Sequence, residues 1–154
     1  MEVLIDNRQK KNKISMTTVQ RKTTDILNAL DCDDAGLSIL IVDDPQIAIL
    51  NKKYLRRYGP TNVIAFPMRT DQFSNINPEL LGDVVISIET AEKEGKSIGI
   101  SLEERFTQLL VHGILHLLGY DHEKSEEQAD KMEKKSDEIL KLIDMEDNSW
   151  LDLR

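Results

Sequence analysis

Cysteine and long apolar runs are nearly missing from this sequence of 154 residues. Cys32 is the single cysteine, which excludes an internal disulfide and a cysteine-based zinc site. No run of 18 apolar residues is present that could span a membrane. The first residues also lack the basic, apolar and small-residue segments of a secretion signal. These absences predict a soluble protein of the reducing cytoplasm with no membrane partner.

An excess of positive charge is also missing. The net charge is −8 at pH 7, which argues against a general nucleic-acid-binding protein. Much of the negative charge lies in residues 121–147, which hold eleven acidic and five basic side chains. Four cations nevertheless cluster near the end of a predicted helix, at Lys52, Lys53, Arg56 and Arg57. Such a cluster is most often a solvated face, but it can also hold phosphates.

Strands and helices alternate along the chain, which predicts one domain covering residues 1–154 with a sizeable core. Asp44 followed by Pro45 has the pattern of a helix N-cap and first turn. Residues 68–81 are expected to form a polar loop, and the tail with Trp150 is expected either to dock or to fray. The periodicity predicts strands at 2–6, 37–42, 62–66 and 82–88, and helices at 17–30, 44–57, 89–96, 101–118 and 125–142.

Histidine is scarce, yet all three histidines fall in one run of eleven residues, HGILHLLGYDH. His112 and His116 are four residues apart and therefore share one face of a helix that is apolar on nearly every side. Gly119 offers a stop from which the chain can return His122 as a third ligand. Three imidazoles and an open position predict a catalytic zinc site. The alternative is a helical histidine pair without metal and one surface histidine.

Gly113 is the informative residue between these histidines. The spacing of His112, His116, Gly119 and His122 matches the metzincin protease pattern H-E-x-x-H-x-x-G-x-x-H. In that pattern the second position is the glutamate that polarises the zinc-bound water, whereas here it is glycine. Either the base comes from elsewhere, or the reaction is not peptide hydrolysis.

Three segments in order resemble one known family. HGILHLLGYDH is similar to the H-G-x-L-H-L-x-G-Y-D-H signature of the YbeY family of rRNA-maturation endoribonucleases. PTNVIAFP at 60–67 and LGDVVIS at 81–87 resemble two further segments of that family. The resemblance implies an α+β fold, in which a small mixed sheet packs with helices around a central, buried histidine-bearing helix with a zincin-like site. It also implies one zinc ion on His112, His116 and His122.

The activity implied by the resemblance is that of a metal-dependent endoribonuclease that prefers single strands. Its expected roles are maturation of the small-subunit rRNA 3′ end and ribosome quality control, with ribosomal RNA, the ribosome or ribosomal proteins as partners. One departure concerns the residue after Tyr54, where the family usually has arginine and this chain has Leu55. Arg56 or Arg57 is then the candidate to bind the substrate phosphate.

The catalytic groups other than the metal site stay open at this point. A zinc-bound water is the expected nucleophile, because three neutral histidines leave the ion its full charge; the RNA 2′-hydroxyl is the alternative. Asp121 and Asp83 each have two interpretations, as a carboxylate that supports the metal site or as a residue of local turn or strand structure. Rival functions are a metalloprotease-like zinc hydrolase, a non-catalytic zinc-containing ribosome-assembly factor, and a hydrolase of small substrates.

Overall fold

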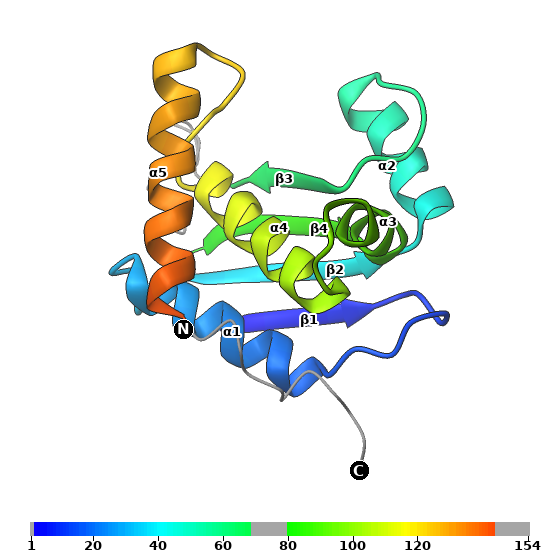
Figure 1. Ribbon diagram of the computed structural model, residues 1–154, viewed down its shortest axis with the longest axis horizontal. Helices are drawn as coiled ribbons and strands as arrows, with labels where there is room; N and C mark the ends of the chain where they lie inside the picture. Colours follow the sequence, from blue (N-terminus) through cyan, green and yellow to red (C-terminus); the bar gives the residue numbers. More distant parts are fainter. Residues whose placement is uncertain (1, 69–79, 144–154) are drawn as a thin grey trace.

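A mixed four-stranded sheet with five helices makes up the part of the chain that the computed structural model describes, residues 2–68 and 80–143. The strand order is β1-β2-β4-β3; β1, β2 and β4 run parallel, and β3 pairs antiparallel with β4 at the edge (Figure 1). The predicted α+β class with a small mixed sheet is confirmed. The elements are β1 (Val3–Asn7), α1 (Met16–Ala29), β2 (Gly36–Val42), α2 (Asp44–Leu55), β3 (Val63–Pro67), β4 (Leu80–Ser87), α3 (Ile88–Ile98), α4 (Leu102–Leu117) and α5 (Glu126–Leu142).

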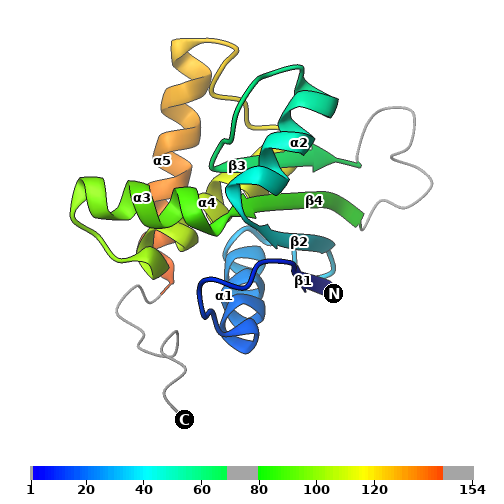
Figure 2. The ribbon, with the colours of Figure 1, turned by 90° about the vertical axis from the view of Figure 1, so that its right-hand side faces the viewer.

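The two faces of the sheet are covered unequally. Alternate residues of β2 point to opposite faces, so Leu37, Ile39 and Ile41 enter the main core that the sheet shares with α1, α4 and α5. Residues of the other alternation, such as Val42 in β2 and Val85 in β4, pack against α2 in a smaller cluster. Figure 2 shows α2 on one side of the sheet and α1 and α4 on the other. The second face is therefore only partly covered.

Helix α4 is the element that fills the main core. Its N-cap Ser101 accepts a hydrogen bond from the Glu104 amide, and nine of its sixteen residues are buried. The helix contacts β3, β4, α3 and α5. A helix enclosed in this way holds its side chains in fixed positions. Within the described ranges, no helix combines the length and the apolar content needed to cross a bilayer.

Several predicted boundaries shift by one or two residues, among them the ends of α2 and α3, and two of the corrections concern the start of an element. The N-cap of α2 is Asp43 rather than Asp44, because Asp43 has the extended backbone of a cap and its carboxylate accepts from the Gln46 amide at 2.9 Å. Strand β4 begins at Leu80, two residues before its predicted start, since residues 80 and 81 already belong to the ladder. Residues 69–79 of the predicted polar loop, and the tail with Trp150, lie outside the described residues.

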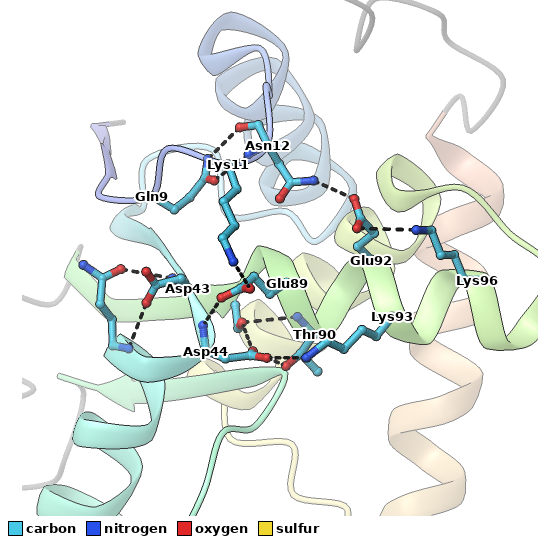
Figure 3. A network of polar contacts seen from close by, with 12 residues as sticks. Gln9, Lys11, Asn12, Asp43, Asp44, Glu89, Thr90, Glu92, Lys93 and Lys96 are labelled. Carbon is cyan, nitrogen blue, oxygen red and sulfur yellow. Dashed lines mark hydrogen bonds and ion pairs between the residues drawn. The ribbon is translucent and has the colours of Figure 1, made fainter.

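Asp44 does not cap α2. Its side chain instead connects the start of α2 with the start of α3. Its carboxylate accepts hydrogen bonds from Ser87 Oγ at 2.6 Å, Thr90 Oγ1 at 2.5 Å and Lys93 Nζ at 2.9 Å. The Asp44 amide donates to Glu89 Oε1 at 2.9 Å (Figure 3). Burial raises the pKa of the Asp44 carboxyl, but the bonds from Ser87, Thr90 and Lys93 together hold that pKa below its usual value.

Replacing Asp44 by asparagine should therefore destabilise the fold in a pH-dependent way. A hydrogen-bonded charge of this kind contributes about 2 kcal/mol to the free energy of unfolding. Since the folded pKa is lowered from about 3.8, the contribution is complete at neutral pH and disappears as the pH falls through the folded pKa. Urea unfolding at pH 7 and at pH 3 should show a large difference from wild type that shrinks in acid. Asp33→Asn, on an exposed turn, should show no such difference.

Candidate functional site

A pocket of about 460 Å³ lies where α4, β3 and the turn after α4 meet. Two features form the walls of this pocket. Helix α4 packs across one face of β3 and β4, and the chain reverses direction after the end of α4. The end of α2 closes the remaining side. The lining residues are Leu55, Arg57, Thr61, Asn62, Val63, Ile64, Ala65, His112, Gly113, His116, Asp121, His122 and Glu123.

All three histidines line this pocket. His112 and His116 lie one turn apart on α4, which ends at Leu117. Gly119 then adopts a φ of 101°, a left-handed value that glycine accepts without strain, and the chain reverses. The reversal returns His122, whose ring centroid lies 5.0 Å from that of His112. The turn expected at Gly119 is confirmed, and the structure brings the three imidazoles together.

The protein environment keeps His112 uncharged. Burial lowers the pKa of His112 most, and the nearby His122, His116 and Arg105 lower it further, to about 4. At neutral pH this imidazole is therefore neutral and carries a lone pair. His116 is notable for its hydrogen bonding: its Nδ1 atom is buried without a hydrogen-bond partner among the described residues. An unpaired buried polar atom costs about 1–3 kcal/mol, which a ligand on this imidazole would help to offset.

The imidazoles are the donor set that the pocket offers to a metal. Within residues 2–68 and 80–143, however, no three His, Cys, Asp or Glu side chains are placed closely enough to hold one ion. His122 is the movable member, because it lies exposed on the turn whereas His112 and His116 are fixed by α4. Three imidazole nitrogen donors suit zinc chemically.

Gly113 occupies the closest approach between α4 and the sheet. A Cβ atom placed on Gly113 would stand 2.6 Å from Val84 Cγ1 and 3.3 Å from Val63 Cγ2. Valine is branched at Cβ and stiff, so neither neighbour can swing away freely. A glutamate side chain has no room at this position. The absence of the protease base thus has a packing reason, and a metalloprotease with this histidine spacing would have to take its general base from another residue.

The structure distinguishes the two candidate substrate arginines. Arg57 lines the histidine pocket, and its Nη2 atom lies 3.4 Å from Glu123 Oε2, next to His122. Arg56 ends α2 in a left-handed conformation with a φ of 54° and does not line the pocket. Leu55 does line it. Of the two cations, Arg57 is the one beside the histidines.

The structure also distinguishes Asp121 from Asp83, because only Asp121 lines the histidine pocket. Asp121 lines the histidine pocket, but its Oδ1 atom accepts from the Glu123 amide at 2.9 Å, which is the turn role. Asp83 lies on the opposite face of the sheet, where it hydrogen-bonds Ser38 and lines a different cavity of about 560 Å³. A supporting role for Asp83 at the histidine site is therefore wrong. The alternation of β4 explains this, since Val84 faces α4 and Asp83 cannot.

A chain of polar contacts beside the pocket was not predicted. Asn62 Nδ2 donates to Glu94 Oε1 at 3.2 Å, and Arg105 Nε donates to the same oxygen at 3.0 Å. Arg105 Nη1 also donates to Gln108 Oε1 at 2.8 Å. Asn62 directly precedes β3, Glu94 belongs to α3, and Arg105 and Gln108 belong to α4. No local spacing in the sequence marks such a set, because it forms only when three elements meet.

Fold and pocket together are those of a small α+β protein with a histidine-lined site beside a buried helix. The family model described as Endoribonuclease YbeY matches residues 4–144. The chain belongs to this family, whose curated relatives are named as RNA-cleaving enzymes.

Several relatives are similar over nearly their whole length. The Endoribonuclease YbeY of Syntrophotalea carbinolica is 46% identical over 140 residues, which is 90% of this chain and 93% of that protein. Those of Syntrophus aciditrophicus and Geobacter metallireducens are 40% and 43% identical, covering 93% and 95% of this chain and 90% and 98% of theirs. A solution structure from Thermotoga maritima aligns with a TM-score of 0.59 at 21% identity, over 90% of this chain and 89% of that one. This last likeness supports the fold alone.

Proposed function

We propose that this protein is a zinc-dependent endoribonuclease that cleaves single-stranded RNA. The observation that carries the proposal is the convergence of His112, His116 and His122 on one pocket in a chain of this family. His112 is neutral at pH 7 and needs no deprotonation to act as a ligand. Gly113 leaves no room for the protease glutamate, which favours phosphodiester over peptide substrates.

Each residue of the pocket has a proposed part. His112, His116 and His122 would hold one zinc ion. When bound, the ion would supply Lewis-acid chemistry that polarises a phosphoryl oxygen and lowers the pKa of a coordinated water. Arg57 would bind the substrate phosphate and keep it against the histidines. Leu55 and the start of β3 would form the opposite wall and limit access of water.

The cellular role that we propose is late rRNA processing, namely maturation of the small-subunit rRNA 3′ end, together with ribosome quality control. Membership of the family supports this role. The substrate would then be ribosomal RNA, met on the ribosome or with ribosomal proteins in the cytoplasm. The net charge of −8 also agrees with a protein that reaches its RNA within an assembled particle rather than through general affinity.

A comparison of substrates tests the proposed function. Purified protein, loaded with zinc and quantified for metal, is incubated with single-stranded RNA, duplex RNA and casein. We expect zinc-dependent cleavage of single-stranded RNA, slower cleavage of duplex RNA, and no casein cleavage. Casein cleavage that is lost with the zinc would support a protease instead. Bound zinc without hydrolysis of any substrate would support an assembly factor.

Arg57→Ala should weaken RNA cleavage, whereas Arg56→Ala should leave it nearly unchanged. Loss of one charge-assisted contact to phosphate predicts about a tenfold decrease in kcat/KM. The salt dependence of RNA binding should also lose about one unit of slope for Arg57→Ala. The two variants remove the same charge from neighbouring positions, so Arg56→Ala is the matched control. If both variants reduced RNA cleavage equally, the two arginines would contribute only general electrostatic attraction to RNA.

A further inference from the structure

A second pocket opens beside the histidine pocket and shares three lining residues with it: Asn62, Val63 and His112. It has a volume of about 330 Å³ and lies between α4 and α5. His112 stands in the wall that the two pockets have in common. A strand of RNA whose phosphate lies at the histidines can therefore place a neighbouring nucleotide in this second pocket.

The lining of the second pocket suits a flat ring with a polar edge. Val63, Leu109 and Leu140 give it an apolar surface, while Gln108 and Asp137 give it polar groups. Enzymes that bind an extruded base hold its ring between aromatic or apolar side chains and read its edge by hydrogen bonds. The size is that of a pocket for one base rather than for a folded RNA.

The charges in the pocket disfavour a phosphate group. Asp137 brings a negative charge to the rim, on the exposed side of α5. The positive charge of Arg105 is already engaged, because its Nη2 atom lies 3.0 Å from Glu94 Oε1. No net positive charge is left over for an anion. The ligand that fits is therefore the uncharged base and not the backbone.

The hydrogen-bonding groups of the pocket have fixed directions. Gln108 Oε1 accepts from Arg105 Nη1 at 2.8 Å, so the Gln108 amide NH₂ is left as a donor. The Asp137 carboxylate can only accept, and within the described part of the chain no hydrogen bond or ion pair engages it. A base in this pocket meets a carboxylate that requires a proton donor.

We propose that the second pocket binds the base next to the scissile phosphate and that Asp137 selects bases with an exocyclic amino group. This proposal rests on the endoribonuclease function proposed above. Cytosine, adenine and guanine each offer an amino group to a carboxylate, whereas uracil presents a carbonyl oxygen at the position of the cytosine amine. Cytosine and uracil have nearly the same shape and differ on the edge that carries C4 and N3, so a preference for cytosine shows that Asp137 accepts from the exocyclic amine rather than from the uracil N3–H.

Nucleotide binding tests the pocket without relying on cleavage. CMP and UMP are titrated into the protein, and the backbone amide signals of Gln108, Ser136 and Asp137 are followed by NMR. We expect CMP to shift these signals and to bind about fivefold more tightly than UMP, the value of one hydrogen bond. Asp137→Asn should remove this preference. Asp130→Asn, on the same helix but outside both pockets, should retain it.

Sequencing of cleavage products from RNA of random sequence supplies the second readout. Wild type and Asp130→Asn should show depletion of uridine at one position beside the cut, and Asp137→Asn should not. Cleavage without such depletion, or equal binding of CMP and UMP, would overturn the inference and leave the endoribonuclease function standing. A wild-type protein that cleaves no RNA would contradict the proposed function, while the titration still decides whether the pocket recognises bases.

Discussion

RNA cleavage by the His116→Ala variant should fall by about a hundredfold or more, together with the loss of bound zinc. His116 lies one turn from His112 on α4, and both side chains line the pocket. The fold should survive this change. The Nδ1 atom of His116 is buried without a hydrogen-bond partner among the described residues, so the substitution removes an unsatisfied polar atom along with some packing.

Thermal unfolding of the metal-free proteins before and after zinc addition makes this test specific. Zinc should raise the Tm of the wild type and raise that of His116→Ala much less, since a ligand that binds the folded state stabilises it. His122→Ala should behave like His116→Ala, although His122 lies on the exposed turn. Lys124→Ala, on the same turn but outside the pocket, is the control. Full cleavage by His116→Ala after zinc removal would point to a contaminating nuclease.

The histidine site could be read from the sequence because its information is local. His112, His116 and His122 lie within eleven residues, and helix geometry alone places the first two on one face. The positive φ of Gly119 is also a local property, since glycine alone adopts it freely. A pattern confined to one helix and one turn needs no knowledge of the tertiary structure, and the structure places all three side chains in the lining of one pocket.

The features that the sequence could not predict depend on contacts between distant segments. Asn62, Arg105 and Asp137 meet at the second pocket from three separate elements, and none has a spacing that marks it. Asp83 was ambiguous for the same reason, because the face that β4 turns toward α4 is decided by strand register. The choice of Asp43 over Asp44 as N-cap rests on the partners that Asp44 finds on α3.

Gly113 shows that one glycine can have a chemical and a packing interpretation at once. In sequence it stands out as the missing glutamate of a zinc protease; in the structure it is where α4 lies against Val84 and Val63. The packing reason is sufficient by itself to require glycine. The missing base and the close helix–sheet contact are thus two consequences of the same small residue.

Gly113→Ala should lower the free energy of unfolding by about 1–3 kcal/mol, the usual cost of overpacking a core. Alanine is the better helix former by about 1 kcal/mol, so the sign of the change reports the contact rather than helix propensity. The methyl group would stand 2.6 Å from Val84 Cγ1, and β4 cannot retreat because it is paired with β2 and β3 on either side. Urea unfolding of the metal-free protein measures the loss.

Val84→Ala supplies the matched test, because it removes the methyl group that Gly113→Ala would strike. Alone it should destabilise the core by creating a small cavity. The double variant with Gly113→Ala should lose less free energy of unfolding than the sum of the two single losses. A difference of at least about 0.5 kcal/mol indicates direct contact between the two residues. If the two losses in free energy of unfolding were strictly additive, the added methyl group would not be in contact with Val84, and the structure would have relieved the clash by moving other residues. Gly113→Glu should unfold the protein even with Val84→Ala, since a longer side chain must displace β4 itself, and it should yield no casein cleavage.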